Sequence, residues 1–431
     1  MRILVLGINY PPEQIGIGPY TGELCASLRS RAADVTVVTT HPYYPQWRVF
    51  PGAGRGWSRR IEGGVEVLRC PVYVPGRPSG AKRLLHHASF AVSVLIPLLW
   101  RAVRERPDLV FVVAPSLAAA PSGLMAAKLA GAPTWLHLQD FEVEAAFATG
   151  LLDPHSRLAS AARAFERWML ARFDVVSSIS PEMVARLAAM GVAKERRFEL
   201  RNWARLDAVR PSTGPSPFRA EWGIRSRHVA LYSGNIANKQ GIEQVVDAAR
   251  LLRDRADLSF VICGDGPNRA DLEATAADLP NVVFRGLQPA ERLNDLLALA
   301  TVHLLPQRAD AADLVLPSKL TNMLASGRPV VAAANPGTGL HREVEGAGVA
   351  VAPEDPAAMA AAITALLDDP AWMAALSSAA RIRAEQVWSR EKVMDGFMSR
   401  LKRVLAGRDG HKPSARLGTP PRRPIDVEEH P

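Results

Sequence analysis

The 431-residue chain is poor in cysteine, with only three, and these lie far apart at Cys25, Cys70 and Cys263. An odd number of distant thiols argues against a disulfide framework, and none of them has the short spacing of metal ligands. We therefore expect three core thiols in a protein of a reducing compartment.

A second absence concerns paired carboxylates. No Asp-x-Asp pair occurs anywhere in the sequence, so the chain lacks one common arrangement for holding a divalent cation. It also lacks a basic stripe interleaved with aromatic residues and any zinc-ligand spacing. We expect neither a required metal ion nor a nucleic-acid partner.

Long apolar runs are scarce as well, and the run at the amino terminus, residues 1–7, is short. It passes directly into Asn9-Tyr10-Pro11-Pro12 without a small-residue cleavage site. This pattern favours a first buried strand over a secretory signal. We expect a cytosolic protein.

The chain alternates short apolar runs with longer helical patterns. Its hydrophobic fraction of 48% and its length fit two domains of about 200 residues each. The alternation indicates βαβ units, so we predict an α/β fold of two Rossmann-like, doubly wound domains facing across a cleft. The expected strands are 3–6, 35–39, 65–69, 109–113, 134–138 and 175–179, followed by 229–232, 258–263, 282–284, 302–305, 330–333 and 349–351.

Composition also predicts domain boundaries. Residues 210–217 are rich in Pro, Ser and Gly and have no apolar periodicity, as expected of a linker. The predicted parts are a first domain at 1–203, a linker at 204–220, a second domain at 221–388, a helix at 389–406 and a disordered tail at 407–431.

The most informative stretch runs through Pro317-Ser318-Lys319 into a helix that closes at Gly327. The start of a helix presents free backbone N–H groups, which attract anions. Ser318 is the expected cap of this helix, and Lys319 adds a positive charge beside it. The turn suits the phosphates or hydroxyls of a nucleotide sugar, although such turns also serve purely structural roles.

Two further glycine turns follow apolar runs in the same half. One carries Gly234 and Asn235 and leads to Lys239, whose charge would lie near a helix N-terminus and a pyrophosphate. The other is Gly264-Asp265-Gly266-Pro267, where glycines let backbone approach a ligand. One such turn is ordinary, but three on successive units indicate a shared site at the carboxyl ends of parallel strands.

Positive charge is concentrated in the first half. The net charge is +9, and residues 1–203 hold 24 basic and 16 acidic residues, so the partner of this half is expected to be anionic. Residues 82–101 are apolar, end in Trp100, and are flanked by Lys82, Arg83 and Arg101. Two interpretations stay open: a helix lying on the inner face of an anionic membrane, and a core helix of the first domain.

Five motifs appear in a characteristic order. They are Gly7-Ile8-Asn9-Tyr10-Pro11-Pro12-Glu13 with Gly16 and Gly18, His41-Pro42-Tyr43-Tyr44-Pro45-Gln46-Trp47, His137-Leu138-Gln139-Asp140, Tyr232-Ser233-Gly234-Asn235 with Lys239-Gln240-Gly241, and Leu316-Pro317-Ser318-Lys319-Leu320-Thr321-Asn322. Together they resemble the retaining, GT-B-type glycosyltransferases of family 4, most closely the colanic-acid fucosyltransferase branch of exopolysaccharide synthesis. The resemblance covers residues 1–405.

This resemblance implies a hexosyltransferase, with no cofactor, that moves sugar from a nucleotide diphosphate to a lipid-linked saccharide. It also implies that the last helix crosses back onto the first domain. Asp140 and His137 would orient the acceptor or accept its proton, and Lys239 would neutralise the leaving diphosphate without a metal. His137 could instead be a buried histidine satisfied by its neighbours.

The remaining implied contacts fall into two groups. The donor-binding positions are Gly16, Gly18, Gly234, Asn235, Lys239, Gly264, Asp265, Gly266, Leu314, Val315, Leu316, Pro317, Ser318, Lys319 and Asn322. The acceptor and membrane positions are Tyr43, Tyr44, Gln139, Glu142, Lys82, Arg83, Trp100 and Arg101.

Two features depart from the family pattern. The Glu-x7-Glu motif falls on Leu314 and Asn322, and the usual arginine of the Gly-Arg…Lys pair is Asn235. Two alternatives therefore stay open beside the transferase: a catalytically inactive GT-B scaffold of polysaccharide assembly and a GT-B sugar-nucleotide 2-epimerase.

Overall fold

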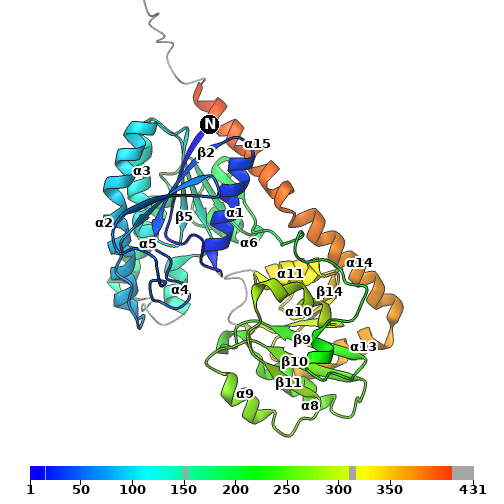
Figure 1. The fold of residues 1–431 in the computed structure, drawn as a ribbon. Coiled ribbons are helices and arrows are strands. Elements are labelled where there is room, and N and C mark those ends of the chain that lie inside the picture. The colour runs from blue at the N-terminus through cyan, green and yellow to red at the C-terminus, as the bar shows by residue number, and fades with distance from the viewer. Residues whose placement is uncertain (15, 149–152, 154, 310–316, 410–431) are drawn as a thin grey trace, which may run out of the picture.

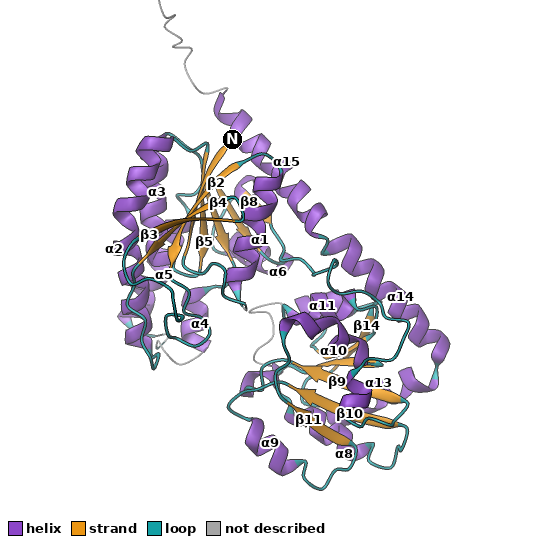
Figure 2. Cartoon of the chain, viewed as in Figure 1, coloured by secondary structure: helices purple, strands orange, loops and turns teal. Residues whose placement is uncertain are grey.

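The computed structural model describes residues 1–14, 16–148, 153, 155–309 and 317–409. These residues form two α/β domains, each built on a mainly parallel sheet with helices on both faces (Figure 1, Figure 2). The predicted fold class is therefore confirmed.

The first domain has an eight-stranded sheet of order β3-β4-β2-β1-β5-β6-β7-β8. Neighbouring strands are parallel except β3, which pairs antiparallel with β4. The strands are β1 (Arg2–Gly7), β2 (Asp34–Thr40), β3 (Ser58–Glu62), β4 (Val65–Cys70), β5 (Leu109–Ala114), β6 (Thr134–Leu138), β7 (Val175–Ser178) and β8 (Arg197–Glu199). The six predicted strands are all present, and β3 and β8 are additional.

Helices cover this sheet on both faces because its central strands are apolar on both faces. Successive side chains of a strand point to opposite faces, so Leu4 and Leu6 pack on one side while Ile3 and Val5 pack on the other. The helices are α1 (Ile17–Ser30), α2 (Gly80–Glu105), α3 (Ala120–Ala130), α4 (Glu142–Ala148), α5 (Arg157–Leu170) and α6 (Pro181–Ala189), with short 3-10 turns at Leu117–Ala119 and Lys194–Arg196.

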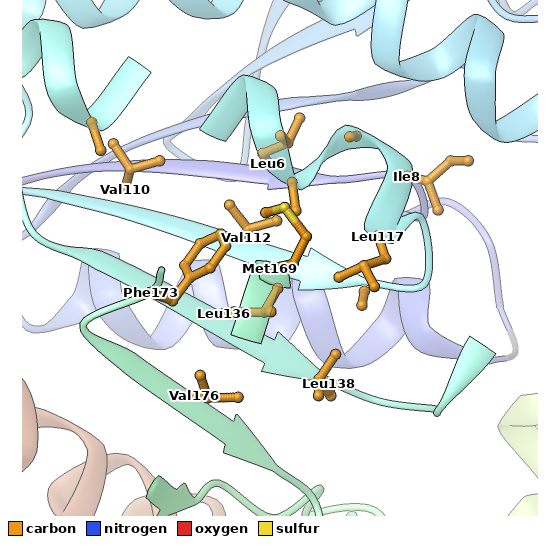
Figure 3. Packing of buried hydrophobic residues seen from close by; sticks show 14 of the residues in the cluster. Leu6, Ile8, Val110, Val112, Leu117, Leu136, Leu138, Met169, Phe173 and Val176 are labelled. Carbon is orange, nitrogen blue, oxygen red and sulfur yellow. The ribbon is translucent and has the colours of Figure 1, made fainter. Parts of the chain in front are cut away.

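One helix layer contains α2, α3 and α5. Leu6, Val112 and Leu136 of the sheet pack against Met169 of α5 on this side (Figure 3). The same cluster includes Phe90 of α2, which is fully buried. This face therefore holds a continuous core under three helices.

The second domain has a six-stranded parallel sheet of order β11-β10-β9-β12-β13-β14. Its strands are β9 (His228–Ser233), β10 (Leu258–Cys263), β11 (Val282–Arg285), β12 (Val302–Leu305), β13 (Val330–Ala333) and β14 (Gly348–Val351). Its helices are α7 (Phe218–Glu221), α8 (Glu243–Leu251), α9 (Arg269–Thr275), α10 (Leu293–Leu299), α11 (Lys319–Ala325), α12 (Gly339–Val344), α13 (Pro356–Asp368) and α14 (Pro370–Val387), with 3-10 turns at Asn238–Gln240 and Ala290–Arg292.

The last helix, α15 (Arg390–Asp409), returns to the first domain and covers the second face of its sheet with α1 (Figure 1). The ring of Phe397 lies 4.7 Å from that of Trp135 and 5.7 Å from that of Phe111, measured between centroids. The core of the first domain thus includes residues from both ends of the chain.

Candidate functional site

The predicted donor glycines of the second domain lie where its strands end, whereas the predicted donor glycines Gly16 and Gly18 lie after β1 in the first domain. Gly234 follows β9 and Gly264 follows β10, and a Cβ added to Gly264 would overlap the Gly234 carbonyl oxygen. Gly234 N–H donates to Cys263 O over 3.0 Å, and Ile236 N–H donates to Asp265 O over 2.8 Å. The two turns therefore meet backbone to backbone, which only glycine permits at position 264.

A lysine from a third element covers this pair of turns. Lys319 begins α11, and its Nζ lies 4.2 Å from the ring centroid of Tyr232 and 3.3 Å from Gln240 Oε1. A Cβ built on Gly234 would lie 3.4 Å from the same Nζ. The amine is thus held against the Gly234 turn by an aromatic ring and an amide.

Arg308, which follows β12, brings a second cation to this edge. Its Nε donates to Asn238 O over 2.9 Å, and its guanidinium pairs with Glu243 at the start of α8. No sequence motif pointed to Arg308. Its place three residues after a strand is the only signal that could have found it.

Tyr43 and Tyr44, two of the predicted acceptor residues, follow β2 in the first domain and lie beside the loop after β1. The carboxylate of Glu13 accepts N–H hydrogen bonds from Tyr43 and Tyr44, both at 3.0 Å, and one from Asn9 Nδ2 at 2.9 Å. Burial raises the pKa of Glu13, although these hydrogen bonds oppose the shift. Through the N–H groups of Tyr43 and Tyr44, Glu13 joins the loop after β1 to the loop after β2. A Cβ on Gly18 of α1 would lie 3.1 Å from a Glu13 oxygen.

Comparison with known proteins places this chain in a family. Residues 16–203 match the "Glycosyl transferase 4-like domain" family, and residues 227–369 match "Glycosyl transferases group 1". WcaI of Escherichia coli (strain K12), a predicted colanic acid biosynthesis glycosyl transferase, is 40% identical over 93% of this chain and 100% of its own length. The chain belongs to the GT4 glycosyltransferases.

Solved structures agree on the fold. A sucrose-phosphate synthase from Thermosynechococcus elongatus superposes with a TM-score of 0.71 at 18% identity, over 94% of this chain and 100% of the other. Anabaena Alr3699/HepE in complex with UDP superposes with a TM-score of 0.66 at 17% identity, over the same shares. The glycosyltransferase is therefore of the GT-B type, and membership implies a nucleotide-sugar donor and a glycan acceptor.

Part of the donor motif lies outside the described residues. These are Leu314, Val315 and Leu316, together with the side chain of Lys239, whose backbone lies in the turn Asn238–Gln240. Ser318 stands at the N-cap of α11, but its side chain does not cap the helix, so that expectation was wrong. Its backbone conformation is already helical, and Thr321 Oγ1 donates to Ser318 O over 2.8 Å.

Asn322 contacts the linker of the glycosyltransferase. Its Oδ1 accepts a hydrogen bond from Arg205 N over 3.0 Å. The amide that was predicted to bind a donor hydroxyl is thus already bonded to the linker backbone, while its donor-binding role stays a prediction.

A buried hydrogen-bond network surrounds His137. Its Nδ1 lies 2.9 Å from Ser177 Oγ, and its Nε2 lies 3.0 Å from Gln139 Nε2. Gln139 and Asn202 exchange two amide hydrogen bonds of 2.8 and 3.0 Å. Burial lowers the pKa of His137 to about 3, so the ring is neutral and supports Gln139. Its predicted catalytic role remains untested.

Asp140 and Glu142 follow β6, on the same edge of the sheet. Asp140 is partly exposed, and its Oδ1 accepts from Phe141 N over 2.8 Å. Glu142 accepts from Leu117 N over 2.7 Å, and burial, with a smaller contribution from the charge of Asp140, raises its pKa to about 7. Both residues are partly accessible at this edge, and each carboxylate accepts a backbone N–H hydrogen bond.

The N-terminal end of α2 packs against the loop after β2 that contains Tyr43, Tyr44 and Trp47, here called the acceptor-side loop. The ring of His86 lies 4.7 Å from that of Tyr43 and 5.5 Å from that of Trp47, and the Arg83 guanidinium lies 5.4 Å from the Trp47 ring. Tyr43 itself is buried, so its ring packs under the acceptor-side loop and does not face solvent.

The predicted membrane contacts divide between the two sides of α2. Lys82 and Trp100 are exposed, whereas Arg101 is buried and paired with Glu66 and Glu105. The membrane contact predicted for Arg101 is wrong, because position 101 shares the inward face with Phe90 and Leu98. By length and composition alone α2 could cross a membrane, yet those inward residues pack it on the sheet.

The edges of the two glycosyltransferase domains are joined by ion pairs. Arg342 of α12 contacts Glu182 of α6, with Nε 3.1 Å from Oε1. Arg201 pairs with Glu199 in its own domain and with Glu343 of α12. These contacts bring α12 next to the strand ends of the first domain.

Proposed function

We propose that the chain is a retaining, metal-independent hexosyltransferase of exopolysaccharide synthesis. It would move a hexose, with fucose as the first candidate, from a nucleotide diphosphate to a lipid-linked saccharide at the inner face of the plasma membrane. The single observation that carries the proposal is the amine of Lys319 held over the interlocked glycine turns of β9 and β10.

The donor end fits a diphosphate. Lys319 and Arg308 bring two cations to the turns after β9 and β12, and Lys239 lies on the same loop.

The proposed transfer keeps the configuration of the sugar. The acceptor oxygen bonds to the anomeric carbon on the face from which the diphosphate departs, and the bond from that carbon to the phosphate oxygen breaks. The cations stabilise charge on the departing diphosphate. Asp140, which is partly exposed after β6, would take the acceptor proton.

We propose that the reaction requires no divalent ion, because Lys319, Arg308 and Lys239 already bring positive charge to the leaving diphosphate. Activity should persist in excess EDTA, because side-chain charge replaces the metal at the leaving group. Complete loss of activity on chelation, restored by manganese, would contradict this part of the proposal.

The acceptor and its location are proposed from two observations. The relative WcaI carries colanic acid biosynthesis in its name, which suggests a cell-surface polysaccharide pathway. The acceptor-side loop packs on α2, whose other side exposes apolar residues. A lipid-linked saccharide acceptor is consistent with both observations.

Thermal unfolding against GDP-, UDP-, dTDP- and ADP-sugars tests the donor class. A ligand at about 100 times its dissociation constant adds roughly 2.7 kcal/mol of stability. We expect one base to raise the melting temperature, and Lys319→Ala and Lys239→Ala to abolish the shift. Leu251→Ala, an exposed position at the end of α8, is the control that should respond like the wild type.

An inactive scaffold is the second candidate, favoured by the bond between Asn322 and the linker. Tight nucleotide binding without turnover would support it. Turnover of the sugar nucleotide in the absence of any acceptor would instead indicate a 2-epimerase.

A further inference from the structure

Exposed apolar side chains are distributed unevenly over the described residues. Eleven of the nineteen large ones lie on α2, α3 and α5, and none lies on α1 or α15. The first three helices cover one face of the first sheet, and the other two cover the opposite face (Figure 1). One side of the domain is therefore apolar at its surface, and the other side is not.

The helix α2 is apolar on two opposite sides. Phe90, Val94 and Leu98 are fully buried against the sheet, while Val92 and Ile96 point away from it, with 78% of Ile96 exposed. Only 22% of the most apolar 18-residue window of this helix is buried. A surface helix normally has one apolar stripe, so the second stripe indicates a second apolar partner.

The neighbouring helices extend this outer stripe. Met125 and Leu129 are exposed on α3, and Phe165 and Trp168 are exposed on α5. Phe165 and Trp168 stack with their ring centroids 6.0 Å apart. The apolar surface thus continues across three helices instead of ending with α2.

The charge of the same helices is strongly positive. Together α2, α3 and α5 hold eight basic and two acidic residues, and of the two acidic ones Glu166 is buried and Glu105 pairs with Arg101. The Arg104 guanidinium lies 5.4 Å from the Trp100 ring, and Arg172, just after α5, lies 4.1 Å from the Trp168 ring. Tryptophan beside arginine suits a lipid headgroup layer, where apolar and charged surroundings meet.

We propose that the outward faces of α2, α3 and α5 form one docking surface for an anionic lipid bilayer. The inference rests on the proposed membrane location and specifies the surface that would achieve it. A second copy of the chain is a poorer occupant, because a symmetric contact would set arginine against arginine. A spanning α2 is poorer too, because its withdrawal would uncover Phe90, Val94 and Leu98.

Docking on this surface would bring the acceptor-side loop to the bilayer. His86 and Arg83 of α2 pack against Trp47, and Tyr44 of the same loop lies beside Gly16. A lipid-linked saccharide would then meet the enzyme near the headgroups. The enzyme would not have to extract the lipid from the membrane.

Flotation of the full-length protein with vesicles tests the surface. The vesicles contain either phosphatidylcholine alone or phosphatidylcholine with 30% phosphatidylglycerol. Two variants probe separate helices: Ile96→Glu on α2 and Trp168→Glu on α5. Each has a matched control on an exposed position of α14 in the second domain, Ile382→Glu and Trp372→Glu. Thermal unfolding with the donor sugar identified by the nucleotide panel is measured in parallel for every variant.

We expect strong binding to the anionic vesicles, at least tenfold weaker binding of Ile96→Glu and Trp168→Glu, and unchanged binding of both controls. High salt should weaken binding as well, because it screens the basic residues. The donor-induced stabilisation should be the same in all five proteins.

Three results would overturn the proposal. They are absence of vesicle binding, equal binding of Trp168→Glu and the wild type, and a dimer in solution that Ile96→Glu dissociates. Each can occur while donor-induced stabilisation is intact, so failure of the docking surface is distinguishable from failure of the transferase function.

Discussion

At the scale of single residues, the predicted donor site at the ends of β9 and β10 depends on groups that meet only after folding. Lys319 reaches Gly234 and Tyr232 from a helix that starts 85 positions further along the chain. The sequence predicts that Lys319 and Gly234 both serve the donor, since each follows a strand at the same edge. It does not predict their mutual contact, because the distance between βα turns depends on strand order and on side-chain conformation.

Replacing Gly264 by Ala should destabilise the second domain by about 2–4 kcal/mol, because the new Cβ would strike backbone that cannot yield. Donor-induced stabilisation should be lost at the same time. Urea unfolding measures the first effect and thermal unfolding with donor measures the second. Gly396→Ala is the matched control: no atom lies within 4 Å of its added Cβ in α15, so it should be neutral or slightly stabilising. Equal stability of Gly264→Ala and the wild type would refute the close contact.

Glu142 should make stability depend on pH. Its pKa is raised to about 7 in the folded protein against an ordinary value of 4.5, so the folded state holds a proton that the unfolded state releases. The stability from this group is full below about pH 4.5 and is lost as the pH rises through 7. Buried His137 has a lowered pKa and acts in the opposite direction, so only a comparison of variants isolates Glu142.

We therefore expect Glu142→Gln to gain stability relative to the wild type as the pH rises from 5 to 8. Melting temperatures across this range measure the difference. Parallel curves for the two proteins would show that Glu142 ionises in the folded state as it does in the unfolded state.

At the scale of single elements, the strands with the clearest patterns were predicted and the weaker ones were missed. The β1 strand is a run of apolar residues buried on both faces and gives a strong signal. The strand β3 reads Ser-Arg-Arg-Ile-Glu and is mostly exposed, so its sequence resembles a loop. The helix α2 was predicted with nearly correct limits, but the inward direction of Arg101 depends on which of its two apolar sides faces the sheet.

Phe397 of α15 should stabilise the first domain although it follows the second domain in sequence. Phe397→Ala removes a fully buried ring that contacts Trp135 and Phe111, so we expect a loss of about 3–5 kcal/mol. Hydrogen exchange should accelerate in β5 and β6 and stay unchanged in β9 and β10. Trp372→Ala, at an exposed position of α14, is the control. Faster exchange in the second domain alone would contradict the packing of α15.

At the scale of the whole molecule, the two domains touch through α6 and α12. The Glu182 carboxylate is largely buried in this contact, and a Cβ on Gly339 would lie 2.6 Å from one of its oxygens. The sequence predicts two domains and a linker but not this contact, since α6 and α12 each carry ordinary surface charges. Their pairing follows from the relative orientation of the sheets.

Glu182→Ala should loosen the relative orientation of the domains, because it removes the ion pair between Glu182 of α6 and Arg342 of α12. We expect a larger radius of gyration in small-angle X-ray scattering, with melting behaviour close to that of the wild type. Glu273→Ala, which removes an ion pair within α9, is the control and should leave the radius unchanged. An unchanged radius for Glu182→Ala would mean that other contacts hold the domains.

The return of α15 also has a consequence for synthesis of the chain. The ribosome synthesises β1 first. One face of the first sheet is completed only by Met394, Phe397 and Leu401, which emerge nearly 400 residues later. Domains usually fold in the order in which they are translated. Here the second domain can finish first, and the first-made domain stays incomplete and exposed to chaperones until the final helix arrives.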